Sequence, residues 1–355
     1  MQQNRILPWR IGAVYVGTVI GAGFASGQEI MQFFTCYGSI GIFTVILSGL
    51  LFITLGYCIF YTAGKFKAYN YKDYITALCG SRLGLIYDII ITIFLFLGTS
   101  IMFSGSGAVF EESLHLPKLA GVLAIAILTL LIVLQSLKGI LRINSLITPS
   151  LMFVTLTVFV LTIFNSDAES FRISAQSLKP DGILKPFFSF IFYCSYNIVL
   201  ALGVLVAFPE KISNSRILSR GAIIGGSGLM LLAFSLNICL MLNTPHIFGL
   251  SIPMIYIAGG ISTAMKYAVM VCIWFEIFST TVSNVFGLSQ RLSRSSPRLF
   301  GLTSALVTLL CIPLAMVDFK SLVSIFYPLF GALSIFLILQ IMYSTITLKG
   351  DASRT

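Results

Sequence analysis

Charged side chains are scarce in this sequence. Asp, Glu, Lys and Arg make up only 10% of the 355 residues, while 57% are hydrophobic and the mean hydropathy is +0.99. A soluble globular protein needs far more polar side chains to cover its surface, so the composition excludes that class. Because long apolar runs cross a bilayer as helices, we predict an all-α integral membrane protein.

The residues and motifs of enzymes are also missing. The only two histidines, His115 and His246, fall in predicted loops, and neither belongs to an HExxH metal motif. The sequence has no GxSxG elbow, no phosphate-binding P-loop and no dinucleotide fingerprint. We therefore expect neither an enzyme nor an ATP-driven pump, and no organic cofactor. The seven cysteines have no paired spacing, which favours packing roles over disulfides.

Long apolar runs are what the sequence does contain. About 20 apolar residues cross the hydrocarbon core. Charged or Pro/Gly/Asn-rich breaks divide the chain into ten predicted transmembrane helices, at 9–36, 39–64, 83–110, 118–137, 141–164, 184–208, 217–242, 262–288, 300–317 and 322–347. The predicted domains are a first five-helix repeat (1–164), an outer loop (165–183), a second five-helix repeat (184–348) and a cytoplasmic tail (349–355).

The basic residues predict how the chain sits in the membrane. If the amino terminus is cytoplasmic, 16 of the 22 Lys and Arg residues lie on the inner side and 6 on the outer side. We therefore expect a multi-pass protein of the inner (plasma) membrane with both termini cytoplasmic. Topology and anionic lipid explain the net charge of +10, so the lipid bilayer is an expected partner and nucleic acid is not. The oligomeric state stays open.

One stretch of the first span is unsuited to a continuous helix. Residues 16–29 read VGTVIGAGFASGQE, with four glycines, each of which costs roughly 1 kcal/mol of helix propensity relative to Ala. In a membrane, freed backbone groups are tolerated only where they are buried in protein or line a polar cavity. The stretch therefore predicts a broken helix at a ligand site. Close helix packing through Gly17 and Gly21, four residues apart, is the alternative interpretation.

A short sequence in the second half of the chain resembles one in the first half. Ile6-Leu7-Pro8 opens the first span and Ile183-Leu184-Lys185-Pro186 opens the sixth, an offset of 178 residues, half the chain length. Polar residues then interrupt the sixth span at 193–197 (YCSYN). Because each half has an odd number of spans, the second half would be inverted relative to the first. We expect a 5+5 inverted repeat in which spans 1 and 6 are discontinuous.

The ten spans, the glycine-rich break and the Ser/Thr cluster at 279–281 resemble the amino acid/polyamine/organocation (APC) superfamily with the LeuT-type fold. The string GAGFASGQE at 21–29 is similar to that of YkvI-type bacterial membrane proteins. The resemblance implies a secondary active transporter that moves a small organic solute by alternating access, in symport with Na⁺ or H⁺. An amino acid or related zwitterion is the expected substrate. A transporter-like sensor or accessory protein that binds a ligand without moving it is the alternative.

The same resemblance implies where the substrate lies. The broken parts of spans 1 and 6 would surround it, with span 3 beside them, and N–H groups near Ala25 to Glu29 would bind its carboxylate. Aromatic side chains would enclose the rest of the solute. The expected substrate contacts are Ile20, Gly21, Ala22, Gly23, Phe24, Ala25, Ser26, Ser100, Ser104, Phe192, Tyr193, Ser195, Tyr196 and Asn197.

Coupling residues follow from the resemblance and from buried charge. In sodium-coupled relatives of this fold, Na⁺ lies between carbonyls of span 1 and hydroxyls of span 8. The matching positions are the carbonyls of Gly17 and Ile20 and the hydroxyls of Ser279, Thr280 or Thr281. Such hydroxyls often bond only to their own helix, which is the alternative.

Two carboxylates, Glu29 and Glu276, fall within predicted spans, where an ionisable group is costly and indicates a function. Glu276 shares a helical face with the Ser/Thr cluster and could bind a cation or carry a proton. This acidic position departs from the sodium-coupled pattern and leaves the ion open. Glu29 could couple as well, or could face solvent at the end of a half-helix. The segment 243–253 is an outer loop that could act as a gate or as an ordinary connector.

Overall fold

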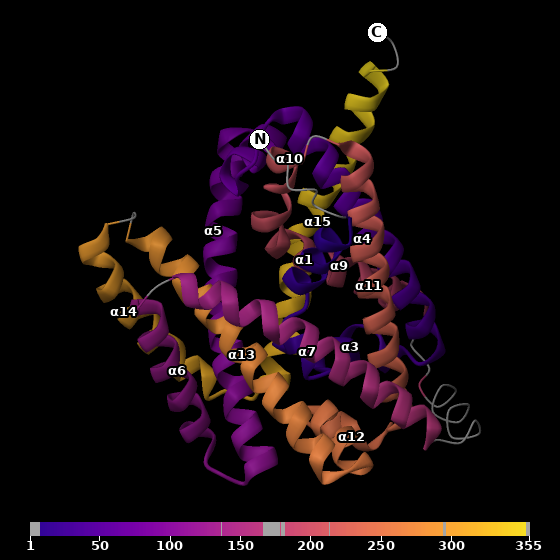
Figure 1. Cartoon of the computed structure of the whole chain (residues 1–355), viewed down its shortest axis with the longest axis vertical. Coiled ribbons are helices and arrows are strands. Elements are labelled where there is room, and N and C mark those ends of the chain that lie inside the picture. The colour runs from indigo at the N-terminus through magenta and orange to yellow at the C-terminus, as the bar shows by residue number, and fades with distance from the viewer. Residues whose placement is uncertain are drawn as a thin grey trace.

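The computed structural model describes residues 8–135, 137–165, 178, 182–212, 214–293 and 296–352, and the regular elements of these ranges are all helices (Figure 1). Most of the predicted outer loop and the Ile6-Leu7 pair lie outside these residues. Within these ranges, six helices are long and apolar enough to cross a membrane: Ser39–Phe66, Tyr71–Ser113, Leu184–Lys211, Ser215–Leu242, Thr263–Leu292 and Phe319–Gly350. Three shorter apolar helices are Lys118–Leu134, Pro149–Phe164 and Leu299–Ala315.

The segment predicted as the first span contains three short helices, α1 (Pro8–Val19), α2 (Ala22–Ala25) and α3 (Gln28–Phe33). Between α1 and α2 the chain is extended at Gly21 (φ −130°, ψ −176°). Between α2 and α3, Gly27 has a φ of +83°, a conformation that only glycine adopts without strain. The glycine-rich stretch thus contains both interruptions, and its backbone is redirected twice within eight residues of Val19.

The remaining helices begin after short connections. The side chains of Asn70, Asn214 and Ser262 each accept a hydrogen bond from a backbone N–H of the helix that follows. Each residue therefore caps the N-terminus of that helix. The elements are η1 (Thr35–Tyr37), α4 (Ser39–Phe66), α5 (Tyr71–Ala108), the π-helix η2 (Val109–Ser113), α6 (Lys118–Gln135), α7 (Leu137–Phe164), α9 (Leu184–Leu205), α10 (Phe208–Lys211), α11 (Ser215–Leu242), η3 (His246–Gly249), α12 (Pro253–Ile261), α13 (Thr263–Leu292), α14 (Pro297–Ala315) and α15 (Phe319–Ala352).

The predicted break in the sixth span at 193–197 is wrong, because α9 runs without interruption from Leu184 to Leu205. Its polar side chains bond to their own helix instead of disturbing it. The Ser195 hydroxyl donates to the Ile191 carbonyl (2.6 Å), and the Asn197 amide donates to the Tyr193 carbonyl (2.9 Å). The helix ends only after Leu205, where a turn leads into the four-residue α10.

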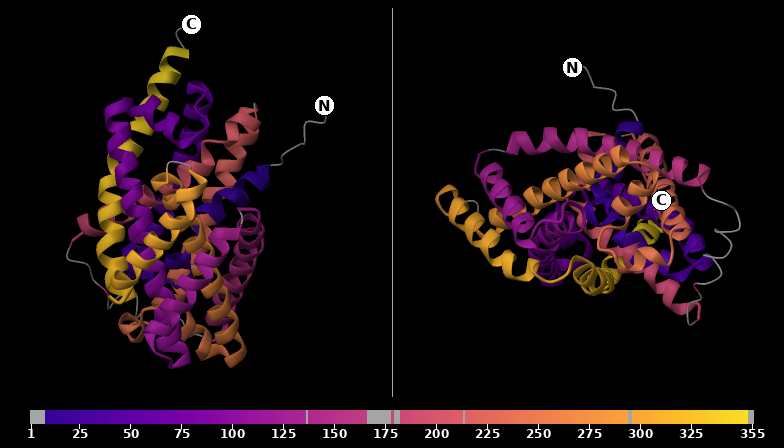
Figure 2. Two further views of the ribbon diagram at one scale, coloured as in Figure 1. Left: turned by 90° about the vertical axis from the view of Figure 1, so that its left-hand side faces the viewer. Right: turned by 90° about the horizontal axis from the view of Figure 1, so that it is seen from below.

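Helix contacts occur in pairs that are related by exchanging the two halves of the chain. α1 packs against α11 as α9 packs against α4, and α5 packs against α15 as α13 packs against α7. Likewise α6 packs on α5 as α14 packs on α13. α4 with α11, and α5 with α13, join the two halves directly. On one flank α6 and α14 lie next to each other (Figures 1 and 2).

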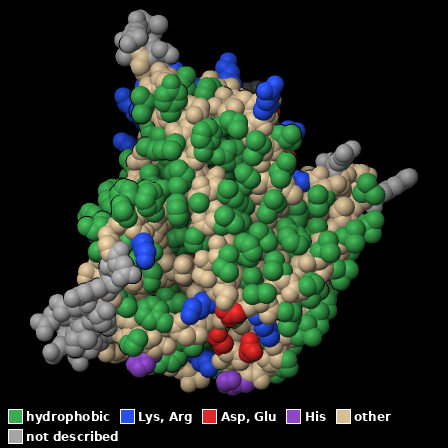
Figure 3. Space-filling model, turned by 180° about the vertical axis from the view of Figure 1, so that it is seen from behind, with side chains coloured by type: hydrophobic (Ala, Val, Ile, Leu, Met, Phe, Trp, Pro, Cys, Tyr) green, Lys and Arg blue, Asp and Glu red, His purple; other side chains and the backbone are tan. Residues whose placement is uncertain are grey.

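The two ends of the molecule differ in charge. Figure 3 shows Lys and Arg side chains around the end where α15 finishes. Carboxylates and the histidines gather at the opposite end, together with some basic side chains. Between the two ends the visible surface is mainly hydrophobic, as expected of a surface that faces lipid.

Candidate functional site

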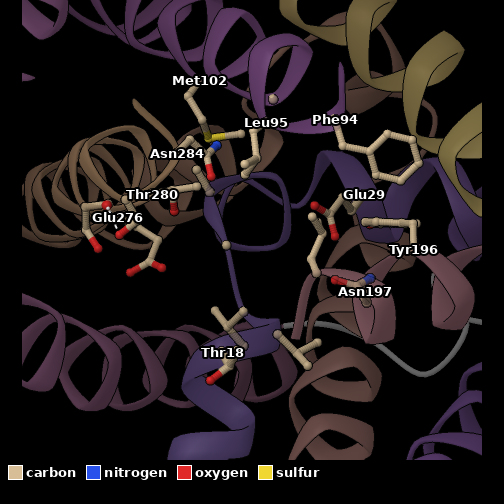
Figure 4. A pocket seen from close by; sticks show the side chains of 18 of the residues that line it. Thr18, Glu29, Phe94, Leu95, Met102, Tyr196, Asn197, Glu276, Thr280 and Asn284 are labelled. Carbon is tan, nitrogen blue, oxygen red and sulfur yellow. Dashed lines mark hydrogen bonds between the residues drawn. The ribbon is translucent and has the colours of Figure 1, made fainter. Parts of the chain in front are cut away.

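A cavity of about 330 Å³ lies beside the interruption of the first span (Figure 4). This volume is in the range of small-molecule sites. The broken first span, α5, α9, α13 and α15 all contribute to its wall. The lining residues are Gly17, Thr18, Val19, Ile20, Gly21, Ala22, Glu29, Phe94, Leu95, Gly98, Met102, Tyr196, Asn197, Leu200, Val204, Glu276, Ser279, Thr280, Ser283, Asn284, Tyr327 and Phe330.

Glu29 reaches the cavity because of two glycines. The turn at Gly27 starts α3 in a new direction and places Glu29 in its first turn. The Glu29 side chain then packs over Gly23, where an added Cβ would lie 2.9 Å from both Cγ and Cδ of Glu29. Real side-chain contacts of this kind are longer, so the space beside Gly23 is available only because this residue has no side chain. Glu29 is 5% exposed in the cavity wall.

Aromatic rings form the wall next to Glu29. The Tyr196 and Tyr327 ring centroids are 5.0 Å apart, and those of Tyr327 and Phe330 are 6.3 Å apart. Phe94 of α5 packs directly on Phe330 and extends this wall. Figure 4 shows Phe94, Tyr196 and Glu29 on the same side of the break. We call the four rings of Phe94, Tyr196, Tyr327 and Phe330 the aromatic wall.

A polar face lies on the other side of the break, where Figure 4 shows Glu276, Thr280 and Asn284 of α13. These residues are four apart and so share one face of the helix. Glu276 is 4% exposed, and its Oε2 has no hydrogen-bond partner among the described residues. We call Glu276, Ser279, Thr280 and Asn284 the polar face. None of the described residues that line the cavity is Lys, Arg or His.

The structure brings ten of the sequence-predicted site residues to this cavity. They come from three separate stretches of the chain, and both buried carboxylates are among them. The ten residues are Gly17, Ile20, Gly21, Ala22, Glu29, Tyr196, Asn197, Glu276, Ser279 and Thr280.

Other predicted residues lie outside the lining of the cavity, and the hydroxyls among them already donate to backbone carbonyls. Ser26 donates to Gly23, Ser100 to Phe96, Ser104 to Val317, Ser195 to Ile191 and Thr281 to Ile277. Gly23, Phe24 and Ala25 are buried in α2. Tyr193 packs in a ring cluster with Phe33, Phe34 and Phe52, and Phe192 lines a separate pocket between α3, α9 and α15.

Four of the N–H groups expected to bind a carboxylate, those of residues 25–28, are occupied. The Ala25 N–H donates to the Gly21 carbonyl (2.9 Å), and the Ser26 N–H donates to the Ala22 carbonyl (2.9 Å). The next two, those of Gly27 and Gln28, donate to the Phe24 carbonyl and to the Ser26 hydroxyl. The reason is that α2 is a closed turn of helix rather than the open end of a long one. These groups therefore have no free donor for a ligand.

Twelve of the 22 lining residues were not anticipated from the sequence. The missed residues are Thr18, Val19, Phe94, Leu95, Gly98, Met102, Leu200, Val204, Ser283, Asn284, Tyr327 and Phe330. Asn284 could have been found, because it lies eight residues after Glu276 and four after Thr280 on one helical face. The aromatic and aliphatic members give no such signal, since apolar residues fill every span of the chain.

The cavity is closed on the side of α12. The Met254 N–H donates to the Ser26 carbonyl (3.1 Å), which fastens the start of α12 to the end of α2. The Glu112 carboxylate accepts hydrogen bonds from the N–H groups of Ser251 (2.9 Å) and Ile252 (3.3 Å). We call residues 246–254 the closing segment. On the other side the cavity reaches the surface, where its lining residues Leu200, Val204 and Ser283 are exposed.

The chain is similar to known membrane proteins along nearly its whole length. It is 30% identical over 339 residues to the uncharacterized membrane protein YkvI of Bacillus subtilis (strain 168), which covers 94% of this chain and 95% of the relative. No model of a protein family matches the chain.

Two solved structures show the fold. A sodium-coupled sialic acid symporter in a substrate-bound, outward-open state matches with a TM-score of 0.66 and 15% identity, over 92% of this chain and 77% of the other. MhsT in complex with L-phenylalanine matches with a TM-score of 0.64 and 14% identity, over 94% of this chain and 87% of the other. The chain therefore has the fold of these transporters.

Proposed function

The chain belongs to the family of the YkvI membrane protein, and we propose that it is a secondary active transporter of a small organic solute that carries an amino group, such as an amino acid or a related compound. The observation that carries this proposal is the cavity beside the broken first span, with two buried carboxylates and a wall of aromatic rings. A site of this kind, at an interrupted helix and closed on one side only, fits the binding step of alternating access.

We further propose ten spans arranged as two inverted repeats. The first repeat (1–164) contains α1 to α3 as one span, then α4, α5, α6 and α7; the second (184–348) contains α9 with α10, then α11, α13, α14 and α15. Residues 165–183 connect the repeats and 349–355 form the tail. The paired contacts between the halves support this arrangement, because an internal repeat makes each contact twice. The second interruption, after Leu205, lies later in its span than the first.

The proposed orientation places both termini in the cytoplasm. The excess of Lys and Arg at the end where α15 finishes supports it, since basic residues are retained on the cytoplasmic side (Figure 3). The closing segment then seals the outer side, and the open mouth at Val204 and Ser283 faces inward. In alternating access the closing segment would release Ser26 when the inner mouth closes. The closing segment, which overlaps the predicted gate at 243–253, would thus act as that gate.

For coupling we propose that the polar face binds the driving ion. Thr280 and Ser279 line the same cavity as Gly17 of α1 and Ile20, which follows α1; the carbonyls of these two residues are the expected partners of a Na⁺ ion. Hydroxyls and carbonyls are the hard oxygen ligands that such a cation prefers. Glu276, whose Oε2 is buried without a partner among the described residues, would neutralise Na⁺ or would itself carry H⁺.

A stability screen of the purified protein tests the binding part of the proposal. A ligand that binds only the folded state raises the apparent stability, by about 2.7 kcal/mol at a hundredfold excess over Kd. We expect solutes with an amino group to raise the melting temperature, and more so when Na⁺ replaces choline or when the pH is lowered, according to the coupling ion. No stabilisation by any amino acid or amine in either condition would contradict the proposal.

A further inference from the structure

A second pocket, of about 510 Å³, lies between α3, α9 and α15, and no described residue lines both this pocket and the cavity beside the broken first span. It is near the end of the molecule where α15 begins. There the first turn of α15 contacts the closing segment, because Asp318 accepts a hydrogen bond from the Ser251 hydroxyl (3.1 Å) and Lys320 donates to the Phe248 carbonyl. The proposed transport function gives this pocket no role.

The pocket opens toward the surface that faces lipid. Leu184 and Phe188 of α9 line it, and both side chains are exposed. Ile325 and Leu329, which each follow a lining residue of α15, are exposed as well. Large apolar side chains on the outside of a membrane protein face the hydrocarbon of the bilayer. A ligand can therefore enter this pocket from the membrane.

Polar and apolar groups are separated along the pocket. On α9, Lys185 lies in the first turn and Phe192 lies seven residues later, which places them roughly 10 Å apart along the helix axis. The Phe192 ring is next to that of Phe188, with centroids 6.1 Å apart. On α15, Ser324 likewise precedes Pro328. This order, polar near the helix starts and apolar farther in, matches a phospholipid, whose headgroup is followed by acyl chains.

The polar part of the pocket suits an anion. Lys185, Gln32 and Tyr37 bring an ammonium, an amide and a phenol to it, all of which can donate hydrogen bonds. The Ser189 hydroxyl donates to the Phe33 carbonyl (2.9 Å). None of the described residues that line the pocket is Asp or Glu. An exposed lysine at the level of the headgroups attracts anionic lipid, so the phosphate is the group that this end of the pocket fits.

One pair of rings separates this pocket from the cavity. Phe33 of α3 lines the pocket, and its ring centroid is 5.8 Å from that of Tyr196, which lines the cavity. The same short helix carries Glu29. A molecule that fills the space between α3, α9 and α15 would therefore hold these three helices together, at the end of the molecule that the closing segment seals.

We infer that this pocket binds an anionic phospholipid, with the phosphate at Lys185 and an acyl chain along Phe188 and Phe192. The bound lipid stabilises the packing of α3 against α9 and α15. The inference goes beyond the proposed function, and it requires only that the chain lies in a membrane. It depends neither on transport nor on the identity of the transported solute.

The test compares two lipids that share their acyl chains and differ in their headgroups. The full-length protein is purified in detergent, and its melting temperature is measured with dioleoylphosphatidylglycerol, with dioleoylphosphatidylcholine and with soluble glycerol 3-phosphate. A ligand of the folded state raises the apparent stability, so we expect phosphatidylglycerol to act at a lower concentration than phosphatidylcholine, and glycerol 3-phosphate to have no effect there. Equal responses to both lipids, or an equal response to glycerol 3-phosphate, would overturn the inference.

A substitution then assigns the phosphate. Lys185→Gln removes the positive charge, and we expect it to weaken binding of phosphatidylglycerol by about fivefold, the effect of one lysine near anionic lipid, without changing the response to phosphatidylcholine. Lys266→Gln is the matched control, because Lys266 also lies near the start of its helix, α13, and is outside the pocket. An undiminished preference for phosphatidylglycerol in Lys185→Gln would overturn the assignment.

Two further measurements locate the acyl chain. Ser324→Phe places a ring in the pocket and keeps Lys185, so we expect it to abolish the stabilisation by phosphatidylglycerol. In the wild type, phosphatidylglycerol should slow hydrogen exchange at the amides of residues 32–37 and 184–192. A full lipid response in Ser324→Phe, or protection confined to other segments, would show that the lipid binds elsewhere and would overturn the inference.

Discussion

The Glu29 side chain packs directly over Gly23, in space that a Cβ at residue 23 would occupy. Because Gly23 has no side chain, the Glu29 carboxylate has room to line the cavity. The relationship crosses the turn at Gly27, whose positive φ folds α3 back toward α2. The glycine-rich stretch therefore has a use beyond breaking a helix, because it also sets the position of a charge.

We predict that Gly23→Ala displaces Glu29 and weakens ligand binding. The new Cβ would lie 2.9 Å from Cγ and Cδ of Glu29, and overpacking of this kind costs about 1–3 kcal/mol. Gly260→Ala in α12 is the matched variant, since a Cβ there meets nothing within 4 Å and the residue lies outside the cavity lining. Melting temperatures with and without ligand would check the pair. Equal ligand responses in the two variants would show that the position of Glu29 does not matter for binding.

Thr280→Val should remove cation-dependent stabilisation. The Thr280 hydroxyl lines the cavity with Gly17 and Ile20, while the Thr281 hydroxyl donates to the Ile277 carbonyl (2.6 Å) and lies outside the lining. A valine at 280 keeps the shape of the side chain but lacks the oxygen ligand. The measurement is the melting temperature in Na⁺ against choline for both Thr→Val variants. If Thr280→Val responds to sodium as Thr281→Val and the wild type do, the sodium site is elsewhere or the driving ion is H⁺.

Glu112→Gln should loosen the closing segment. Its carboxylate accepts the N–H groups of Ser251 and Ile252, and because Glu112 is exposed, solvent screening limits their contribution to about 1 kcal/mol. We expect faster hydrogen exchange at the amides of residues 251–254, including Met254, which donates to Ser26. Glu111→Gln is the matched control, because the bonds to Ser251 and Ile252 are made by Glu112, and it should exchange like the wild type. Unchanged exchange in Glu112→Gln would show that the segment is held by other contacts.

Gly225→Ala should destabilise the packing of α1 on α11. An added Cβ would lie 2.9 Å from both Cβ and Cγ of Tyr15, whose hydroxyl is fixed by a hydrogen bond to the Phe52 carbonyl (2.8 Å). The ring cannot move without losing that bond, so we expect a cost of about 1–3 kcal/mol and a lower melting temperature. Gly203→Ala in α9 meets nothing within 4 Å and should be neutral or slightly stabilising. A melting temperature of Gly225→Ala equal to that of the wild type would mean that α1 adjusts freely.

The sequence predicts the features that depend on unusual residues. The helical membrane class follows from composition, the interruption of the first span from its glycines, and the resemblance to YkvI-type proteins is confirmed by a relative along nearly the whole chain. Glu29 and Glu276 are noticeable because carboxylates are rare in apolar spans, and both line the cavity. A rare residue type can therefore be recognised as a site candidate from the sequence alone, without knowledge of the fold.

The features that depend on packing were not predictable. Tyr193 to Asn197 suggested a break by their polarity, but hydrogen bonds to the preceding turn keep α9 continuous. Phe94, Tyr327 and Phe330 form most of the aromatic wall. The chain has 30 Phe and 14 Tyr residues, and nothing in the sequence distinguishes these three from the others. Only the fold brings them to Glu29. The occupied N–H groups of residues 25–28 likewise depend on α2 being a closed turn.

Accumulation of solute in vesicles is the most direct test of the central claim, that the cavity is the substrate site of a secondary transporter. The reconstituted wild type and Gly23→Leu would be compared for uptake of the labelled solute that stabilises the protein best, under an inward Na⁺ or H⁺ gradient. The account predicts that the wild type concentrates the solute above equilibrium, that an ionophore abolishes this accumulation, and that folded Gly23→Leu shows none. Binding without accumulation in any gradient would contradict it and would identify a transporter-like sensor instead.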